Sequence, residues 1–129
     1  MNEPLRILLI EDQLPDAELL ERELRRDGLQ FSLQRVTTSE SFQVALKTFD
    51  PHVILSDSNV PGFGGLEAIE LAKKLAPDIP FIFLSGQTFE DRKTVALQRG
   101  ASDYVDKDRQ ERIVAVITRA LEAKKRGGH

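Results

Sequence analysis

The sequence contains no cysteine among its 129 residues. A disulfide, a thiolate nucleophile and a cysteine-based metal site are therefore excluded, and we expect a reducing compartment, with the cytoplasm as the default location. The chain also lacks any apolar run close to the roughly 18 residues that a membrane span needs, and its N-terminus lacks the basic and apolar regions of a signal peptide. We therefore expect no membrane association.

A surplus of positive charge is absent as well. Lys and Arg number 18 against 21 Asp and Glu, which gives a net charge of −3. Because phosphate contacts require basic side chains, direct binding to nucleic acid is not expected. Glycine and proline are few, at 8 and 6, while 40% of the residues are hydrophobic. This length and composition predict one globular domain with its own core.

Short apolar runs alternate with segments of helical periodicity along the whole chain. The apolar runs predict strands at residues 5–10, 31–36, 53–57, 81–84 and 103–105. The periodic segments predict helices at about residues 15–26, 38–49, 66–75, 89–99 and 109–121. Repeated strand and helix units form parallel sheets covered on both faces, because each crossover is right-handed and the strands are apolar on both sides. We therefore predict an α/β fold: a doubly wound five-stranded parallel sheet of order 2-1-3-4-5 with five helices, which is flavodoxin-like.

Local signals mark the ends of these elements and the loops between them. Pro15 is suited to the first turn of the first helix, and Asp27-Gly28 is suited to its end. Thr37 and Glu40 have the spacing of a capping box for the second helix. His52 follows a proline in the loop before the third strand, and we predict that it is a surface residue without a ligand role.

Polar side chains follow four of the predicted strands at the points where those strands end. The third strand delivers Asp57 into a loop rich in proline and glycine, and ligands of open α/β sheets bind at this end of the strands. Taken singly, each polar residue also fits a turn, a loop or a surface charge. In the order 2-1-3-4-5, however, the ends of strands one, three, four and five converge on one rim, and the residues there are Glu11, Asp12, Asp57, Ser85 and Lys107.

Such a rim would suit phosphoryl transfer. Three crowded carboxylates repel one another unless a cation joins them or one takes up a proton. Oxygen ligands select a hard ion, and Mg²⁺ is the expected one because it keeps waters that a phosphate can replace. Asp57 would then attack phosphorus as the nucleophile, while the metal and Lys107 neutralise the phosphoryl oxygens. Ser85 would donate a hydrogen bond to the transferred group.

Four segments carry a family resemblance. They are Leu8-Leu9-Ile10-Glu11-Asp12, Asp57 with Pro61-Gly62-Phe63-Gly64-Gly65-Leu66, Leu84-Ser85-Gly86, and Gly100-Ala101-Ser102-Asp103-Tyr104-Val105-Asp106-Lys107. Together they resemble the receiver domain of two-component response regulators, the chemotaxis-regulator-like domain. The resemblance covers about residues 5 to 123. It implies a receiver domain at residues 1–123 and a C-terminal tail or linker at residues 124–129.

The resemblance also implies roles for the acids. Asp57 would be the phosphoacceptor for a histidine kinase or a histidine phosphotransfer protein. Mg²⁺ would be held by Glu11, Asp12, Asp57 and the backbone carbonyl of Asn59, with Asp12 a more direct ligand than Glu11.

A switch is implied by three further residues. Ser85 would be the switch hydroxyl, Lys107 the phosphate-binding cation, and Tyr104 the aromatic whose rotation accompanies activation. Phosphorylation adds charge and acceptor oxygens that would draw Ser85 and Lys107 inward, and this would change the surface of helix four, strand five and helix five. The simpler reading of Tyr104 is a partly buried strand residue that does not move.

One departure from the family pattern concerns the peptide after Lys107. Asp108 stands where many receivers have a proline after a cis bond. Without proline a cis bond costs roughly 3 kcal/mol, so we predict a trans peptide here.

Three other functions are less favoured by the sequence. A receiver-shaped interaction module that is never phosphorylated is one alternative, although every expected group is present. An aspartyl-phosphate hydrolase is less favoured because Asn59 occupies the position of its second acid. A flavin or dinucleotide carrier is disfavoured because the loop after strand one is not rich in glycine. We therefore expect a signalling domain that catalyses at most its own phosphorylation and dephosphorylation, is a monomer or weak homodimer, and acts on an output partner that the sequence does not identify.

Overall fold

The computed structural model describes residues 4–57, 63, 65–85, 103–106 and 111–127. Five strands are β1 (Leu5–Ile10), β2 (Phe31–Val36), β3 (Val53–Asp57), β4 (Phe81–Ser85) and β5 (Asp103–Asp106). The described helices are α1 (Leu14–Arg26), α2 (Ser39–Thr48), α3 (Gly65–Leu75) and α5 (Ile113–Gly127). The helix predicted at residues 89–99 lies outside the described residues.

The strands form one parallel sheet in the predicted order. Its order is β2-β1-β3-β4-β5, and every neighbouring pair is parallel. The flavodoxin-like strand order expected from the sequence is therefore confirmed. Since β1 and β3 lie next to each other at the centre, residues 46 positions apart in sequence meet there: Ile10 pairs with Ser56.

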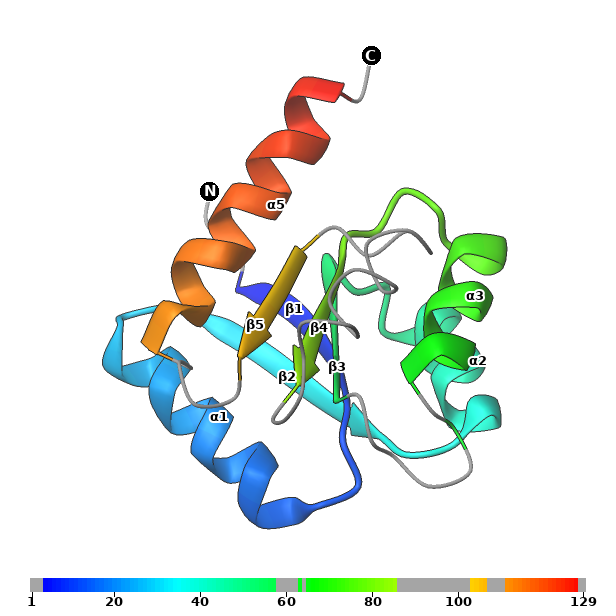
Figure 1. The fold of residues 1–129 in the computed structure, drawn as a ribbon, viewed down its shortest axis with the longest axis horizontal. Coiled ribbons are helices and arrows are strands. Elements are labelled where there is room, and N and C mark those ends of the chain that lie inside the picture. Colours follow the sequence, from blue (N-terminus) through cyan, green and yellow to red (C-terminus); the bar gives the residue numbers. More distant parts are fainter. Residues whose placement is uncertain (1–3, 58–62, 64, 86–102, 107–110, 128–129) are drawn as a thin grey trace.

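Helices cover the sheet on both faces (Figure 1). On one side α2 and α3 pack on Leu8, Ile10 and Ile54, and on the other side α1 and α5 pack on Ile7 and Leu9. Successive side chains of a strand point to opposite faces, so each central strand contributes to both layers of the core. This explains why the strands read as unbroken apolar runs in the sequence.

The boundaries of α1 agree with the predicted signals. Pro15 lies in the first turn, and Gln13 occupies the N-cap position without a capping hydrogen bond from its side chain. Asp27 is the C-cap residue, and Gly28 has a φ of 81°. A positive φ of this kind is strained for residues with a Cβ, so glycine suits the end of this helix.

The capping box of α2 differs from the prediction by one residue. Thr38, not Thr37, is the N-cap residue, and its side chain accepts a hydrogen bond from the backbone N–H of Ser41. The Ser41 hydroxyl accepts in turn from the backbone N–H of Thr38 at 3.2 Å. The predicted pair of Thr37 and Glu40 was wrong because two adjacent threonines offer the same capping chemistry, and serine can replace the usual Glu in the reciprocal bond.

His52 is more than a surface residue. It is half-buried, and its Nδ1 accepts a hydrogen bond of 2.8 Å from the backbone N–H of Arg6. Its own backbone N–H donates to the carbonyl of Arg6 at 2.8 Å. The Arg6 Nε also donates a hydrogen bond to the backbone carbonyl of Asp50. The residue Asp50 has a positive φ of 52°. His52 therefore helps to join the beginnings of β1 and β3.

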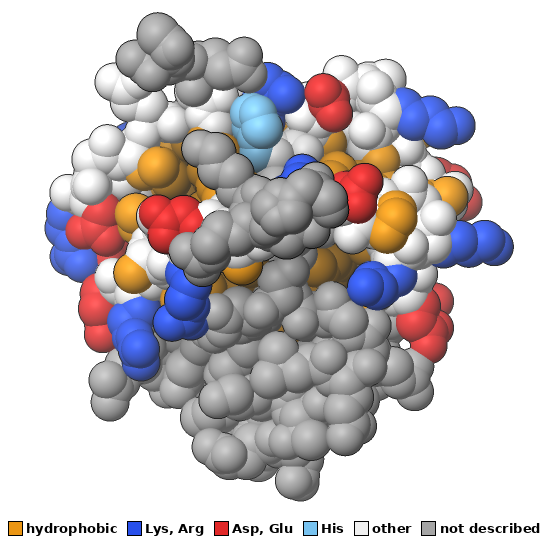
Figure 2. Space-filling model, turned by 90° about the horizontal axis from the view of Figure 1, so that it is seen from above, with side chains coloured by type: hydrophobic (Ala, Val, Ile, Leu, Met, Phe, Trp, Pro, Cys, Tyr) orange, Lys and Arg blue, Asp and Glu red, His pale blue; other side chains and the backbone are white. Residues whose placement is uncertain are grey.

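The last helix continues beyond the predicted domain boundary. α5 extends to Gly127, so the first four residues of the tail predicted at 124–129 are helical. Among the described residues no helix is long and apolar enough to cross a membrane. Acidic and basic side chains are interspersed on the face shown in Figure 2, in line with the nearly balanced composition.

Candidate functional site

Asp57 lies at the carboxyl end of a completely buried strand, β3. Every residue of β3 is buried, and Asp57 itself is only 5% exposed. Burial of a carboxylate is unfavourable unless charged or hydrogen-bonding groups compensate for the lost water. A buried acid at this end of a central strand therefore indicates a site and not an ordinary turn.

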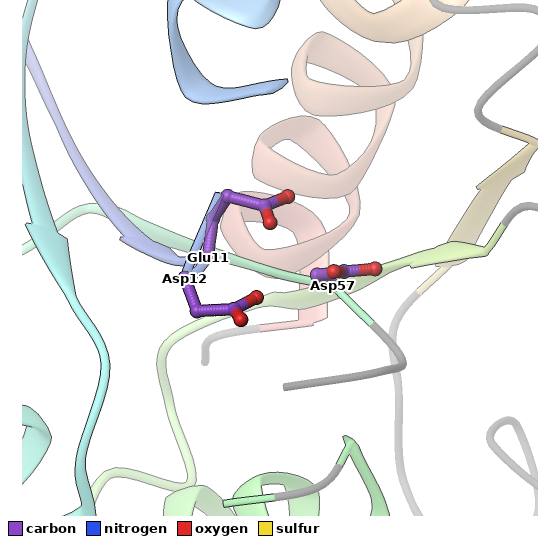
Figure 3. A group of neighbouring side chains, drawn as sticks. All are labelled: Glu11, Asp12 and Asp57. Carbon is purple, nitrogen blue, oxygen red and sulfur yellow. The ribbon is translucent and has the colours of Figure 1, made fainter. Parts of the chain in front are cut away.

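Two more acids extend from the neighbouring strand toward the same point (Figure 3). Glu11 and Asp12 directly follow β1, whose last residue pairs with the residue before Asp57. Glu11 is 2% exposed and Asp12 is half-buried. One carboxylate oxygen from each of the three acids lies within 4.8 Å of the others. The predicted convergence of Glu11, Asp12 and Asp57 is confirmed.

Neighbouring groups hold the two acids that follow β1. The backbone N–H of Gln13 donates to Glu11 Oε2, and its side-chain amide donates to Asp12 Oδ2, each at 3.1 Å. Arg35, from β2, donates from Nη1 to the backbone carbonyl of Glu11 at 2.9 Å. Sequence reasoning missed both residues. Gln13 directly follows the acid pair and could have been considered, but no local signal connects Arg35 with Glu11.

The three carboxylates fit a small divalent cation. Mg²⁺ bonds of about 2.1 Å place neighbouring ligand oxygens roughly 3 Å apart and opposite oxygens about 4.2 Å apart. The carboxylate oxygens of the acid cluster lie within 4.8 Å of one another, so small side-chain movements would bring them to these separations. A cation would also relieve the repulsion between three negative charges, two of which are removed from water. These residues can therefore hold a hard ion through oxygen atoms.

The remaining predicted site residues are placed only in part. Ser85 ends β4 one residue beyond Leu84, which pairs with Asp57, so its backbone is at the same edge of the sheet. Tyr104 belongs to β5, but the side chains of Ser85 and Tyr104 are outside the described part of the chain. Asn59 and Lys107 also lie outside the described residues, as does the predicted trans peptide between Lys107 and Asp108. Their roles stay predictions.

The fold and the site together define a class of protein: a flavodoxin-like α/β domain with a cluster of acids at the carboxyl edge of its central strands. Residues 7–118 match the family model of the response regulator receiver domain. The chain belongs to this family of two-component signalling domains. The resemblance found in the sequence motifs is confirmed.

Individual relatives agree with this assignment. The chain is 32% identical over 107 residues to the phosphate regulon transcriptional regulatory protein PhoB of Klebsiella pneumoniae, covering 79% of this chain and 44% of the relative. It is 30% identical over 121 residues to the cell cycle transcriptional regulator CtrA of Caulobacter vibrioides, covering 90% of this chain and 52% of the relative. The chain thus spans about half the length of these two curated relatives.

Solved structures are similar in fold over nearly the whole chain. NtrX from Brucella abortus matches with a TM-score of 0.83 and 25% identity, covering 95% of this chain and 28% of that protein. A putative response regulator from Chloroflexus aurantiacus matches with a TM-score of 0.82 and 25% identity, covering 93% and 99% of the two chains. A receiver fold of this size therefore occurs both within a longer protein and as nearly a whole solved chain.

Proposed function

We propose that Asp57 accepts a phosphoryl group, in a step that depends on Mg²⁺, from a histidine kinase or a histidine phosphotransfer protein. One observation carries the proposal: the carboxylates of Glu11, Asp12 and Asp57 gather at the carboxyl edge of a receiver-family sheet. Asp57 is the member of this cluster on the central strand β3. The resemblance to receiver domains implies that this aspartate is the phosphoacceptor. The backbone carbonyl of Asn59 is proposed as a further oxygen ligand.

The chemistry follows from the charges at the site. When bound, Mg²⁺ neutralises oxygens of the phosphoryl group and reduces their repulsion of the attacking carboxylate. A carboxylate oxygen of Asp57 forms a bond to phosphorus while the bond from phosphorus to the histidine nitrogen breaks. The electron pair of that bond stays on the imidazole, and Asp57 becomes an acyl phosphate. Lys107 is proposed to neutralise the remaining charge on the phosphoryl oxygens.

The proposed output is a change of surface near the edge strand β5. The phosphoryl group would attract Ser85 and Lys107, and Tyr104 would move into the space that Ser85 leaves. The affected surface would comprise the segment at residues 89–99, β5 and α5. The curated relatives are named as transcriptional regulators, but this chain spans only about half of them. We therefore propose signalling through an output partner, without direct nucleic-acid binding by this domain.

A stability measurement tests the metal site. Addition of Mg²⁺ at ten times its dissociation constant should raise the free energy of unfolding by about 1.4 kcal/mol, because the ion binds only the folded protein. Asp12→Asn should reduce this gain, since it removes one of three ionic ligands. Urea unfolding with and without Mg²⁺ measures both quantities. Asp27→Asn is the matched control, because Asp27 is exposed at the end of α1. An equal response of Asp12→Asn and wild type would contradict the assignment.

A second measurement tests Lys107. Lys107→Ala should slow phosphorylation of Asp57 by about tenfold or more, because a positive charge near the phosphoryl oxygens would be lost. The free energy of unfolding should stay close to that of wild type. Lys47→Ala, an exposed lysine in the last turn of α2, serves as the control. Unchanged phosphorylation and unchanged output in Lys107→Ala would remove this lysine from the mechanism. Sustained hydrolysis of an added phosphoester by the purified protein would instead contradict the signalling role.

A further inference from the structure

Arg35 makes an unusual contact beside the acid cluster. It is exposed near the end of the edge strand β2, and its guanidinium donates to the carbonyl of Glu11 at 2.9 Å. That carbonyl belongs to the peptide joining Glu11 to Asp12. The side chain therefore reaches the backbone between two of the three acids that form the candidate metal site.

The sheet explains why this carbonyl requires a partner. The ladder between β1 and β2 continues one residue beyond the strands, because the N–H of Glu11 donates to the carbonyl of Val36 at 3.2 Å. In a parallel pair the next hydrogen bond would run from the N–H of Thr38 to the carbonyl of Glu11. Thr38 instead donates its N–H to the Ser41 hydroxyl in the capping box of α2. The beginning of α2 thus removes the regular donor, and Arg35 supplies another.

We propose that Arg35 is a positioning residue for the Mg²⁺ site. By holding the carbonyl of Glu11, it restricts rotation of the peptide group between Glu11 and Asp12. The side chains on either side of this peptide group provide two of the three carboxylates. Groups that hold metal ligands in place commonly affect affinity without touching the ion. This inference rests on the proposed function, since it concerns the affinity of the acid cluster for Mg²⁺.

The charge of Arg35 acts in the opposite direction. A guanidinium near three carboxylates repels a cation, so its removal would tighten Mg²⁺ binding if this repulsion were dominant. Arg35 is exposed, and water screens the charge of an exposed side chain strongly over distance. The hydrogen bond to Glu11 acts at direct contact. We therefore expect positioning to outweigh repulsion.

Calorimetric titration of the folded protein with MgCl₂, without any phosphodonor, tests this inference. The amide nitrogen of Arg35→Gln ends two bonds short of the arginine Nη1 that donates to Glu11, so this variant should lose the hydrogen bond and weaken Mg²⁺ binding by about tenfold, the lower range for loss of a group that orients metal ligands. Arg35→Lys keeps a charged donor and should lose less Mg²⁺ affinity than Arg35→Gln. Arg22→Gln removes the same charge from an exposed position on α1 and should leave the affinity unchanged. Urea unfolding without Mg²⁺ checks that each variant folds.

The outcomes separate this inference from the proposed function. If wild type binds Mg²⁺ and Arg35→Met binds it equally well or more tightly, the positioning role is overturned while the metal site stands. If wild type does not bind Mg²⁺, the proposed function fails and the inference fails with it. Arg35→Met keeps the apolar stem and has no N–H donor in its side chain. It should show the same tenfold loss, and it replaces Arg35→Gln if that variant does not fold.

Discussion

Replacement of Asp57 by asparagine is expected to abolish phosphorylation of the domain. Wild-type protein incubated with Mg²⁺ and a small phosphodonor should gain one phosphoryl group that is stable in acid and labile in base. Asparagine has nearly the same shape as aspartate, but its neutral amide is a poor nucleophile and a weaker ligand for a hard cation. Intact mass with and without donor and metal measures the modification directly.

The control for Asp57→Asn separates loss of the acceptor from loss of charge. Asp27→Asn makes the same chemical change at an exposed position on the end of α1 and should be modified like wild type. Omission of Mg²⁺ should slow the modification of wild type and of Asp27→Asn alike. Modification that persists in Asp57→Asn would place the acceptor elsewhere, and the proposed mechanism would be wrong.

Among the substitutions considered for this domain, Phe42→Ala is expected to lower the free energy of unfolding the most. Phe42 is completely buried on α2, and its ring lies 5.5 Å from that of Phe63, measured between centroids. Removal of a buried aromatic ring leaves a cavity and should lower the free energy of unfolding by about 3–5 kcal/mol. Because Phe63 follows Asp57 by six positions in the sequence, the cavity would lie against a residue between the proposed phosphoacceptor and α3. Urea unfolding measures the difference.

The same helix offers a matched control for Phe42→Ala. Val44 is two residues further along α2 and is 58% exposed. Val44→Ala should change the free energy of unfolding by no more than about 0.5 kcal/mol. Phe42→Leu should lie between Phe42→Ala and wild type, and it allows the comparison even if the alanine variant does not fold. Similar losses in Phe42→Ala and Val44→Ala would show that the buried layer under α2 is not packed as described.

Strand order and the position of the acids could be predicted because both follow from short-range patterns. The apolar run at residues 53–55 is completely buried, as expected for a strand that is covered on both faces. Once five such runs alternate with helices, chain connectivity restricts the parallel order to a few arrangements. Asp57 then lies at the carboxyl edge as a consequence of its position after the run.

Contacts between distant segments could not be predicted in the same way. The contact of Arg35 with Glu11 depends on β2 ending next to β1, and on Thr38 using its N–H in the cap of α2. The hydrogen bonds between His52 and Arg6 join residues 46 positions apart. Neither contact is marked by a local motif. The residues next to an arginine or a histidine in the sequence are similar whether its side chain faces water or another strand.

By itself, the sequence determined the class of fold, the family and the identity of the three acids, because hydrophobic periodicity and the residues that end each strand are properties of adjacent positions. Only the tertiary structure decided that the three carboxylates approach within 4.8 Å and that Arg35 and Gln13 hold the backbone and side chains beside them. The reason is that hydrogen bonds and ionic contacts depend on distances of a few ångströms. Such distances are set by the register of neighbouring strands and by the points at which helices begin.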